Sequence, residues 1–191
     1  PLRALARDLA TQLAGFCEAL SLPWRVGVRN GDSTAKERRQ LRQALPEVLI
    51  TTPESLSLLL SSPSFLAQVP SLNAVIIDEW HALLGSKRGV LLELALARLD
   101  SLAPQARRWG LSATVADPDH ALAVLLGPER GGRLIQGPKG APPAVTTLIP
   151  EAIERFPWAG HLGLRSLPQV LARLQEAPSS LVFCNTRFQA E

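Results

Sequence analysis

Short apolar runs alternate with helical patterns along most of this 191-residue chain, and this alternation restricts its fold more than any other feature. Runs typical of strands lie at 24–28, 48–51, 73–77 and 108–111. Segments typical of helices lie at 2–20, 36–45, 89–102 and 117–126, and Pro53 opens a further one. Because strands that alternate with helices favour a parallel sheet, the sequence predicts an α/β fold with a mostly parallel sheet covered by helices.

A change of composition at Gly127 indicates a domain boundary. The stretch 127–143 is rich in glycine and proline, as connecting segments usually are. Beyond it we expect a strand at 145–149, a helix at 166–175 and a strand at 180–183, which are too few elements for a complete domain. The chain contains no methionine, so we expect it to be a piece of a longer protein.

Composition excludes several classes of protein. With 46% hydrophobic and 19% charged residues, the chain is globular rather than disordered. It has no membrane-length apolar run and no signal pattern at its start, so we expect no membrane partner and a cytoplasmic location. Its two cysteines, Cys17 and Cys184, are far apart in the sequence, which argues against a disulfide framework and a zinc site. The net charge of +3 is too small to show a nucleic-acid partner.

The segment from Val75 to His81 carries the clearest chemical signal. Its apolar strand ends in two adjacent carboxylates, Asp78 and Glu79, at the end of a parallel strand where ligands usually bind. The first can hold a magnesium ion, usually through water, and the second can orient or deprotonate an attacking water. Taken alone, the pair is more typical of an ordinary helix-capping turn.

Other motifs occur in a fixed order around the pair, and together they favour a functional role for the two carboxylates over a simple helix-capping turn. The set resembles the motifs of superfamily 2 helicases, with 1–5 similar to motif Ia, 52–54 to motif Ib, 78–81 to the DExH box, 112–114 to motif III and 181–187 to motif IV. The segments 78–89, 155–164 and 181–187 resemble the large helicase-related family. Within it, the chain is most similar to the bacterial ligase-associated DEXH-box helicases.

The resemblance implies an architecture and a set of ligands. It implies a RecA-like three-layer sandwich that lacks its P-loop strand, with 1–137 as a partial first domain. Residues 138–191 would then be a linker and the start of a second RecA-like domain. The implied cofactors are ATP and Mg²⁺. The implied partners are single-stranded or partly duplex DNA and DNA-repair proteins, and RNA stays an alternative because backbone contacts discriminate poorly unless the 2′-hydroxyl is read.

The resemblance also implies roles for the residues that match catalytic motifs. Asp78 would coordinate magnesium, Glu79 would be the catalytic base, and His81 would couple the nucleotide site to motif III. Ser112 and Thr114 would link hydrolysis to domain movement. The alternative for His81 is a histidine at a helix start that forms only a local hydrogen bond. The alternative for Ser112 and Thr114 is a turn at the strand end in which their hydroxyls are hydrogen-bonded.

A second set matches positions that hold the backbone of one nucleic-acid strand: Arg3, Gly31, Asp32, Thr52 and Arg187. At Thr52 the physics agrees, because a hydroxyl and backbone N–H groups at a helix start can hold a phosphate. Such contacts read no bases. Gly31 and Asp32 can equally form a simple tight turn. Lys87 and Arg88 can contact nucleic acid or form a solvated basic loop.

The chain departs from the helicase pattern because it contains no GxxxxGK[ST] segment, which we expect upstream of Pro1. We therefore predict a fragment of an ATP-dependent DNA helicase with a role in DNA repair, inactive when isolated. The rival readings are a non-catalytic nucleic-acid-binding module, an RNA helicase, and a translocase within a restriction or remodelling complex. The intact Asp78–Glu79 pair argues against the first rival.

Overall fold

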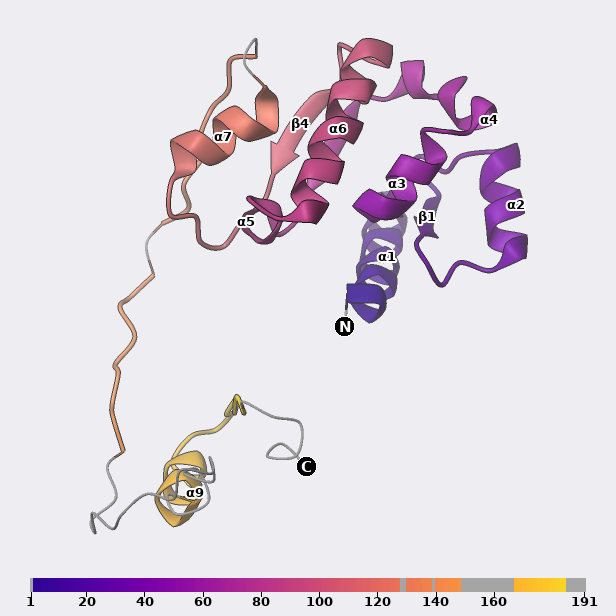
Figure 1. The fold of residues 1–191 in the computed structure, drawn as a ribbon. Coiled ribbons are helices and arrows are strands. Elements are labelled where there is room, and N and C mark those ends of the chain that lie inside the picture. Colours follow the sequence, from indigo (N-terminus) through magenta and orange to yellow (C-terminus); the bar gives the residue numbers. More distant parts are fainter. Residues whose placement is uncertain (1, 128–129, 139, 149–166, 185–191) are drawn as a thin grey trace. The chain divides into compact units, whose positions relative to one another are not determined.

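The computed structural model describes residues 2–127, 130–138, 140–148 and 167–184, with side chains from Leu5 onward (Figure 1). The chain divides into two compact units, 1–136 and 137–191, and each is described by itself. None of the described helices is both long and apolar enough to cross a membrane.

The first unit alternates helices with short strands. Its elements are α1 (Leu2–Ala19), β1 (Val26–Arg29), α2 (Ala35–Gln43), β2 (Val48–Thr51), α3 (Pro53–Leu59), α4 (Pro63–Leu66), the 3₁₀ helix η1 (Val69–Ser71), β3 (Ala74–Ile77), α5 (Trp80–Leu83), α6 (Lys87–Leu102), β4 (Arg107–Gly110) and α7 (Pro118–Leu126). In the second unit the described helix is α9 (Leu167–Gln175). The helices and strands predicted for the first unit are confirmed, while the short α4, η1 and α5 were not predicted.

Two predicted strands of the second unit are wrong. Residues 145–148 and 180–183 belong to no strand or helix, and Ile149 lies outside the described residues. A strand exists through hydrogen bonds to a neighbour, and the described part of this unit offers these segments none. Val145 and Phe183 are both 87% exposed, so no packing substitutes for the missing ladder. The helix predicted nearby is present as α9, with Ser166 outside the described range.

The strands pair in parallel, as the sequence predicted. β1 pairs with β2, with Arg29 opposite Thr51, and β3 pairs with β4, with Ile77 opposite Gly110. Among the described residues the two pairs are not hydrogen-bonded to each other. Because paired strands run in the same direction, the loops that follow β1 and β2 lie at one end of their sheet, and those that follow β3 and β4 do likewise.

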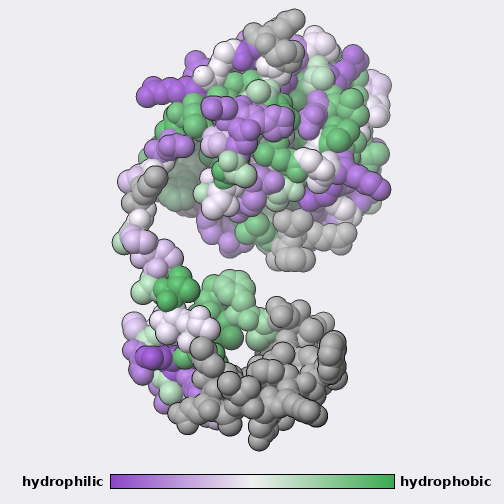
Figure 2. Space-filling view, turned by 60° about the vertical axis from the view of Figure 1, so that its left-hand side comes forward, coloured by the Kyte–Doolittle hydropathy of each residue, from purple (hydrophilic) through white to green (hydrophobic). Residues whose placement is uncertain are grey.

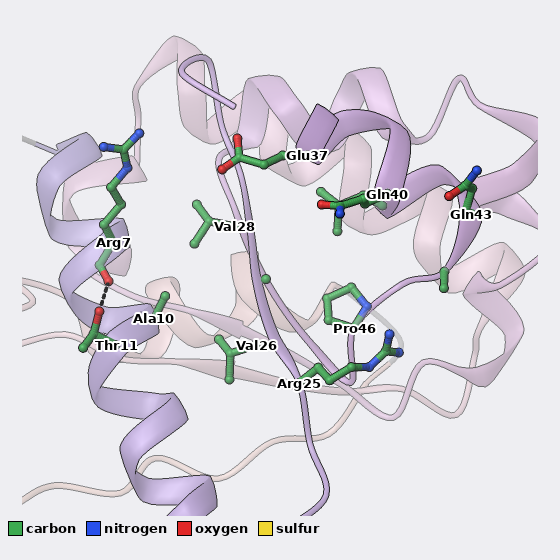
Figure 3. Close-up of a pocket in the computed structure, with 13 residues that line it drawn as sticks. Arg7, Ala10, Thr11, Arg25, Val26, Val28, Glu37, Gln40, Gln43 and Pro46 are labelled. Atoms are coloured by element: carbon green, nitrogen blue, oxygen red, sulfur yellow. Dashed lines mark hydrogen bonds between the residues drawn. The ribbon is translucent and has the colours of Figure 1, made fainter. Parts of the chain in front are cut away.

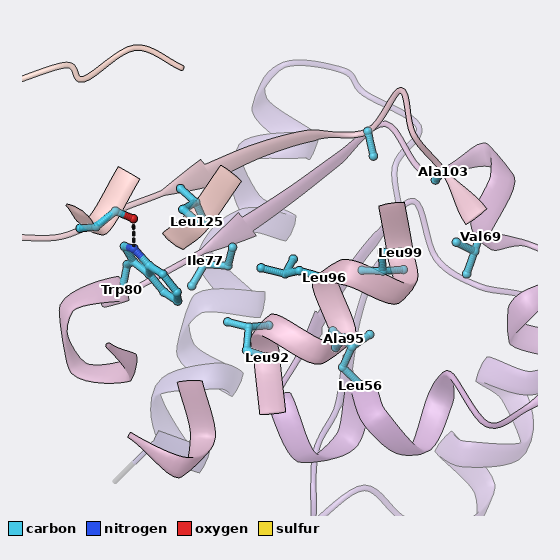
Figure 4. Close-up of a cluster of buried hydrophobic side chains, with 12 residues drawn as sticks. Leu56, Val69, Ile77, Trp80, Leu92, Ala95, Leu96, Leu99, Ala103 and Leu125 are labelled. Carbon is cyan, nitrogen blue, oxygen red and sulfur yellow. Dashed lines mark hydrogen bonds between the residues drawn. The ribbon is translucent and has the colours of Figure 1, made fainter. Parts of the chain in front are cut away.

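The core lies where α6 runs alongside β3 and β4 (Figure 4). Leu96 at its centre is 1% exposed, and Ile77 of β3 and Leu125 of α7 belong to the same cluster. The other sheet face is open within the described unit, since Ile76 and its register partner Trp109 are 66% and 48% exposed. On the side of this unit that Figure 2 presents, hydrophilic and hydrophobic residues are interspersed.

Local signals explain why helices begin where they do. Thr34 and Glu37 form a reciprocal capping box at α2, while Thr52 and Asp117 cap α3 and α7, each followed by a proline at the first turn. Gly89 is required in the first turn of α6, because a Cβ there would lie 2.0 Å from the Leu83 carbonyl oxygen.

Arg108 is a buried cation that joins three elements, with 5% of its side chain exposed. Its guanidinium donates to the Leu96 carbonyl of α6 at 2.9 Å and to the Leu125 carbonyl of α7 at 2.8 Å. It also pairs with Asp100, which in turn binds Arg130 at 2.9 Å. A buried charge is tolerated when its donors are satisfied in this way.

We expect Arg108→Met to lower the free energy of unfolding by about 3–5 kcal/mol, because it leaves buried carbonyls without donors and removes one cation from Asp100. Urea unfolding measures the change. Arg107→Met is the matched control, since Arg107 is an exposed arginine on the same strand, and it should shift stability by less than about 0.5 kcal/mol. Equal effects of the two substitutions would contradict a bracing role for Arg108.

Candidate functional site

The β3–β4 ladder continues past the ends of both strands and builds the candidate site. The Leu111 N–H donates to the Ile77 carbonyl at 2.8 Å, and the Trp80 N–H donates back to the Leu111 carbonyl at 2.9 Å. These bonds hold the segment 78–81 beside the segment 112–114. The two catalytic motifs predicted from the sequence are therefore neighbours in space.

The two carboxylates sit on a sharply turned backbone. Glu79 has φ +51° and ψ +44°, the left-handed conformation that non-glycine residues rarely adopt. Its N–H donates to the Asp78 carboxylate oxygen Oδ1 at 2.9 Å, so the first carboxylate helps to hold the turn. Both residues are exposed. Strained backbone of this kind persists where the surrounding structure enforces it, often at functional sites.

His81 connects the first motif to the second. Its Nδ1 lies 2.8 Å from the Ser112 hydroxyl, which donates to the Thr114 carbonyl at 3.2 Å. Because the serine has one hydroxyl hydrogen and gives it to Thr114, the network assigns the Nδ1 hydrogen to His81 as the donor toward Ser112. Glu79 Oε2 is 3.4 Å from the same nitrogen. Thr114 therefore takes part in this hydrogen-bond network through its backbone carbonyl rather than through its hydroxyl.

Trp80 has a packing role, as the sequence indicated. It is 3% exposed, and its indole N–H donates to the Ala121 carbonyl of α7 at 2.9 Å (Figure 4). Gly110 leaves room for the ring, since a Cβ at that position would lie 3.3 Å from Trp80 Cδ1 and 2.9 Å from Leu125 Cδ2. The indole therefore anchors the start of α5 to α7.

Gly31 and Asp32 lie in a turn at the carboxyl end of β1. Asn30 is 3% exposed and accepts the Asp32 N–H at 3.0 Å, while its own N–H donates to the Ser33 hydroxyl at 3.0 Å. Ser33 donates on to the Val28 carbonyl at 3.3 Å. The sequence predicted a turn at 30–33, since asparagine and serine around glycine are its usual signal, but it did not predict that Asn30 and Ser33 are buried.

Thr52 caps α3 and has a charged neighbour. Its hydroxyl accepts the Ser55 N–H at 3.3 Å. Glu54 in the same turn binds Arg88 through two hydrogen bonds, with Nε at 2.6 Å and Nη2 at 3.3 Å from the two carboxylate oxygens. Arg88 lies in the first turn of α6 rather than in the loop that the sequence indicated. The ion pair therefore neutralises an acid beside Thr52 and links the two candidate regions.

The Arg88 guanidinium holds the pKa of the Glu54 carboxyl at about 2, below its usual 4.5, while partial burial acts in the opposite sense. Hydrogen bonding to the same carboxylate raises the pKa of Arg88. Both side chains are about half exposed, so solvent screens the pair and its contribution to stability stays below about 1 kcal/mol.

The structure does not place two of the predicted strand contacts, nor one segment on which the family resemblance rests. The side chain of Arg3, the residue Arg187 and the segment 155–164 lie outside the described residues. A hollow of about 790 Å³ lies among α1, β1 and α2 and is lined by Arg7, Gln40 and other residues (Figure 3). It is open and holds none of the predicted catalytic residues.

The donor set at the strand end suits magnesium bound with a phosphate partner. No group of three or more acidic, histidine or cysteine side chains gathers among the described residues, so this part of the chain does not form a closed metal cage. Mg²⁺ is usually held by one or two carboxylates together with water and substrate phosphates. Asp78 fits that pattern, because the turn uses its Oδ1 and the residue is otherwise exposed.

Comparison with known proteins assigns this arrangement to a family. Residues 1–121 match the DEAD/DEAH box helicase family model. The chain belongs to the DEAD/DEAH box helicase family. Its relatives include the Lhr helicase/probable uracil glycosylase of Mycolicibacterium smegmatis, 39% identical over all of this chain, and the Lhr helicase/uracil glycosylase of Escherichia coli, 44% identical over 80% of it. The predicted resemblance to the large helicase-related family is confirmed.

Solved structures agree with the predicted RecA-like α/β fold. The structure of Mycobacterium smegmatis helicase Lhr bound to ssDNA and AMP-PNP matches 96% of this chain with a TM-score of 0.64 at 36% identity. The DUF1998 helicase MrfA matches 65% with a TM-score of 0.57 at 22% identity, which shows the fold alone. The chain spans 13% and 10% of the two Lhr relatives and 24% of the solved Lhr chain.

We expect Arg88→Gln to raise the pKa of Glu54 most of the way from about 2 to 4.5, because the guanidinium is the largest cause of the shift. A carbon-13 NMR titration of the side-chain carboxyl measures it. Since the folded-state pKa is depressed, the pair stabilises the fold above pH 4.5 and loses that contribution as the pH falls toward 2. Arg98→Gln, which removes an exposed arginine of α6, should leave the midpoint unchanged. A midpoint unaffected by Arg88→Gln would contradict the ion pair.

Proposed function

We propose that this chain is part of a longer ATP-dependent helicase or translocase that couples Mg-ATP hydrolysis to movement along single-stranded DNA. The observation that supports it most is the direct connection between the DExH box and motif III through Leu111 and the His81–Ser112 contact. In a motor protein, the hydrolysis site must be connected to a second element of the domain. Here the connection is the contact between His81 Nδ1 and the Ser112 hydroxyl, which are 2.8 Å apart.

In this proposal the two carboxylates divide the chemistry at the end of β3. Asp78 holds magnesium, through water, with the oxygen that the turn leaves available. Glu79 is the catalytic base, which orients and deprotonates the attacking water. Magnesium would supply charge neutralisation of the phosphates.

His81, Ser112 and Thr114 form the coupling element. A change in the position or charge of Glu79 reaches His81 across 3.4 Å and continues to the 112–114 loop through hydrogen bonds. In the proposed motor this route carries the state of the nucleotide to the motif III loop. The exposed positions of these residues leave them accessible to a second domain.

Arg3, Gly31, Asp32, Thr52 and Arg187 are the proposed contacts to one nucleic-acid strand. The parallel β1–β2 pair supports this for three of them, because the loops after both strands lie at the same sheet end. A solved Lhr relative bound to ssDNA supports DNA as the partner. RNA stays the alternative, since backbone contacts of this kind read no base.

The proposed domain division is a partial first RecA-like domain at 1–137 and the start of a second at 138–191. The small share of the Lhr relatives that this chain spans supports its place in a longer protein. DNA-repair proteins are proposed partners of that protein. Phosphoryl transfer depends on positioned cations, and the sequence contains no GxxxxGK[ST] segment to hold the phosphates, so the experiments below use the full-length protein.

In that protein we expect Glu79→Gln to retain ATP binding and lower the rate of hydrolysis by about a hundredfold or more, since the amide keeps the shape but cannot accept the proton. Steady-state ATPase assays and nucleotide titrations separate the two effects. Glu18→Gln, which changes an exposed glutamate of α1 in the same way, is the matched control and should be without effect. Turnover near the wild-type rate in Glu79→Gln would remove the catalytic assignment.

We also expect Thr52→Ala to weaken single-strand binding equally for all base compositions, because it removes a backbone contact. Thr52→Ser is the matched control, since it keeps both the hydroxyl and the helix cap. Arg3→Ala should lower the slope of log affinity against log salt by about one unit. Fluorescence anisotropy at several salt concentrations measures both. Wild-type affinity in Thr52→Ala, or an unchanged slope in Arg3→Ala, would count against that contact.

A further inference from the structure

The positive charge of this chain is concentrated in one short segment. Residues 29–43 contain five cations and two acids: Arg29, Lys36, Arg38, Arg39, Arg42, Asp32 and Glu37. The segment therefore carries a net charge of +3, which equals that of the whole chain, and the other residues balance to zero. It comprises the end of β1, the turn after it and the helix α2.

The two sides of α2 differ in character. One side lines the hollow beside β1 with Glu37, Gln40 and Leu41, two of which are labelled in Figure 3. Leu41 approaches the strand closely, since a Cβ on Gly27 would lie 3.5 Å from its Cδ2. No basic residue of α2 lines that hollow.

The opposite side of α2 is a basic face, which we define as Lys36, Arg38, Arg39 and Arg42. Residues three or four apart are neighbours on a helix, and at 100° per residue these four occupy one continuous arc. All four are exposed. Such like charges repel one another and weaken an isolated helix, so the arrangement is not explained by the stability of α2.

Among the residues that the structure describes, no acid neutralises three members of the basic face. Within the described part of the chain, the side chains of Lys36, Arg39 and Arg42 form no ion pair or hydrogen bond. Glu37, the one acid of α2, is occupied by its cap, where it accepts the Thr34 N–H at 2.6 Å. Arg38 differs, since it donates to the Ser33 carbonyl at 2.9 Å and braces the turn.

The basic face continues to the sheet end where the proposed strand contacts lie. Partial burial lowers the pKa of Arg29, and repulsion from the nearby Arg38 and Arg42 lowers it further. Arg29 is opposite Thr51 in the sheet register, and its carbonyl accepts the Thr51 hydroxyl at 2.8 Å. Thr52 is the next residue, so the positive field adjoins it.

We propose that Lys36, Arg39 and Arg42 bind the sugar–phosphate backbone of a nucleic acid and extend the strand path beyond Thr52. The proposal rests on the proposed function, because it assumes a strand at the β1–β2 end. Phosphates spaced along a polyanion match cations spaced along a helix, and guanidinium groups bind phosphate through paired hydrogen bonds. The contacts carry no base preference, as a motor on any sequence requires.

The shape of α2 disfavours an anionic membrane as the partner. A helix that lies in a membrane interface needs a broad apolar face opposite its cations. In α2 the side opposite the cations holds Glu37 and Gln40, and its Leu41 is half-buried toward β1. A nucleic acid requires no such insertion.

The test uses the full-length protein with Lys36→Gln, Arg39→Gln and Arg42→Gln combined, because glutamine is a good helix former. Single-stranded DNA and RNA oligonucleotides of mixed sequence are titrated by fluorescence anisotropy at several KCl concentrations. Three lost phosphate contacts should reduce the salt slope by about two units, which is about a hundredfold weaker binding at 0.1 M salt. Arg39→Gln alone should reduce it by about 0.7.

The matched control combines Arg98→Gln, Arg107→Gln and Arg133→Gln, which removes the same charge from exposed arginines elsewhere. An unchanged slope in the α2 variants, or an equal decrease in the control, would overturn the proposal and leave the proposed function standing. Binding to phosphatidylserine vesicles that is lost in the α2 variants, with DNA binding intact, would also overturn it. A wild-type protein that binds no single strand would instead contradict the proposed function itself.

Discussion

The arrangement of the candidate site depends on a pair of backbone hydrogen bonds just beyond β3 and β4. The Leu111 N–H donates to the Ile77 carbonyl, and the Leu111 carbonyl accepts the Trp80 N–H. These two bonds extend the β3–β4 pairing and hold the segment 78–81 beside the segment 112–114. The Trp80 indole then anchors α5 to α7 from the buried side. A left-handed Glu79 is tolerated between these two attachments because neither end of the turn can relax without breaking a buried contact.

Much of the first unit could be predicted from the sequence, because its signals are local. A capping threonine followed by proline or glutamate determines where α2 and α3 begin, and apolar runs of four residues become the strands. The predictions at 145–149 and 180–183 rested on the same kind of apolar run. They were wrong over the described residues because a run becomes a strand only when a neighbour supplies its ladder, and sequence alone does not show the neighbour.

The candidate site was predictable as a set of residues rather than as a geometry. The order of the motifs indicated Asp78, Glu79, His81 and Ser112, and their roles stay proposals. The tautomer of His81 follows from its hydrogen bond with the Ser112 hydroxyl, which itself donates to the Thr114 carbonyl. Only the three-dimensional structure shows these contacts. The Arg88–Glu54 pair joins residues 34 positions apart, so the charge pattern of the sequence could not predict it. From the sequence, Arg88 could either contact nucleic acid or lie in a solvated loop.

The arginines of this chain carry their charge in two different environments, one buried and one exposed. Arg108 is buried, and carbonyl groups of α6 and α7 together with Asp100 satisfy its donors, so its charge serves the fold. The cations of α2 are exposed, and three of them lack any such partner among the described residues. Solvation makes an exposed charge inexpensive, but four on one arc still repel. A polyanion that binds this face would relieve that repulsion and release its own counterions, so the same residues that weaken the isolated helix would strengthen the complex.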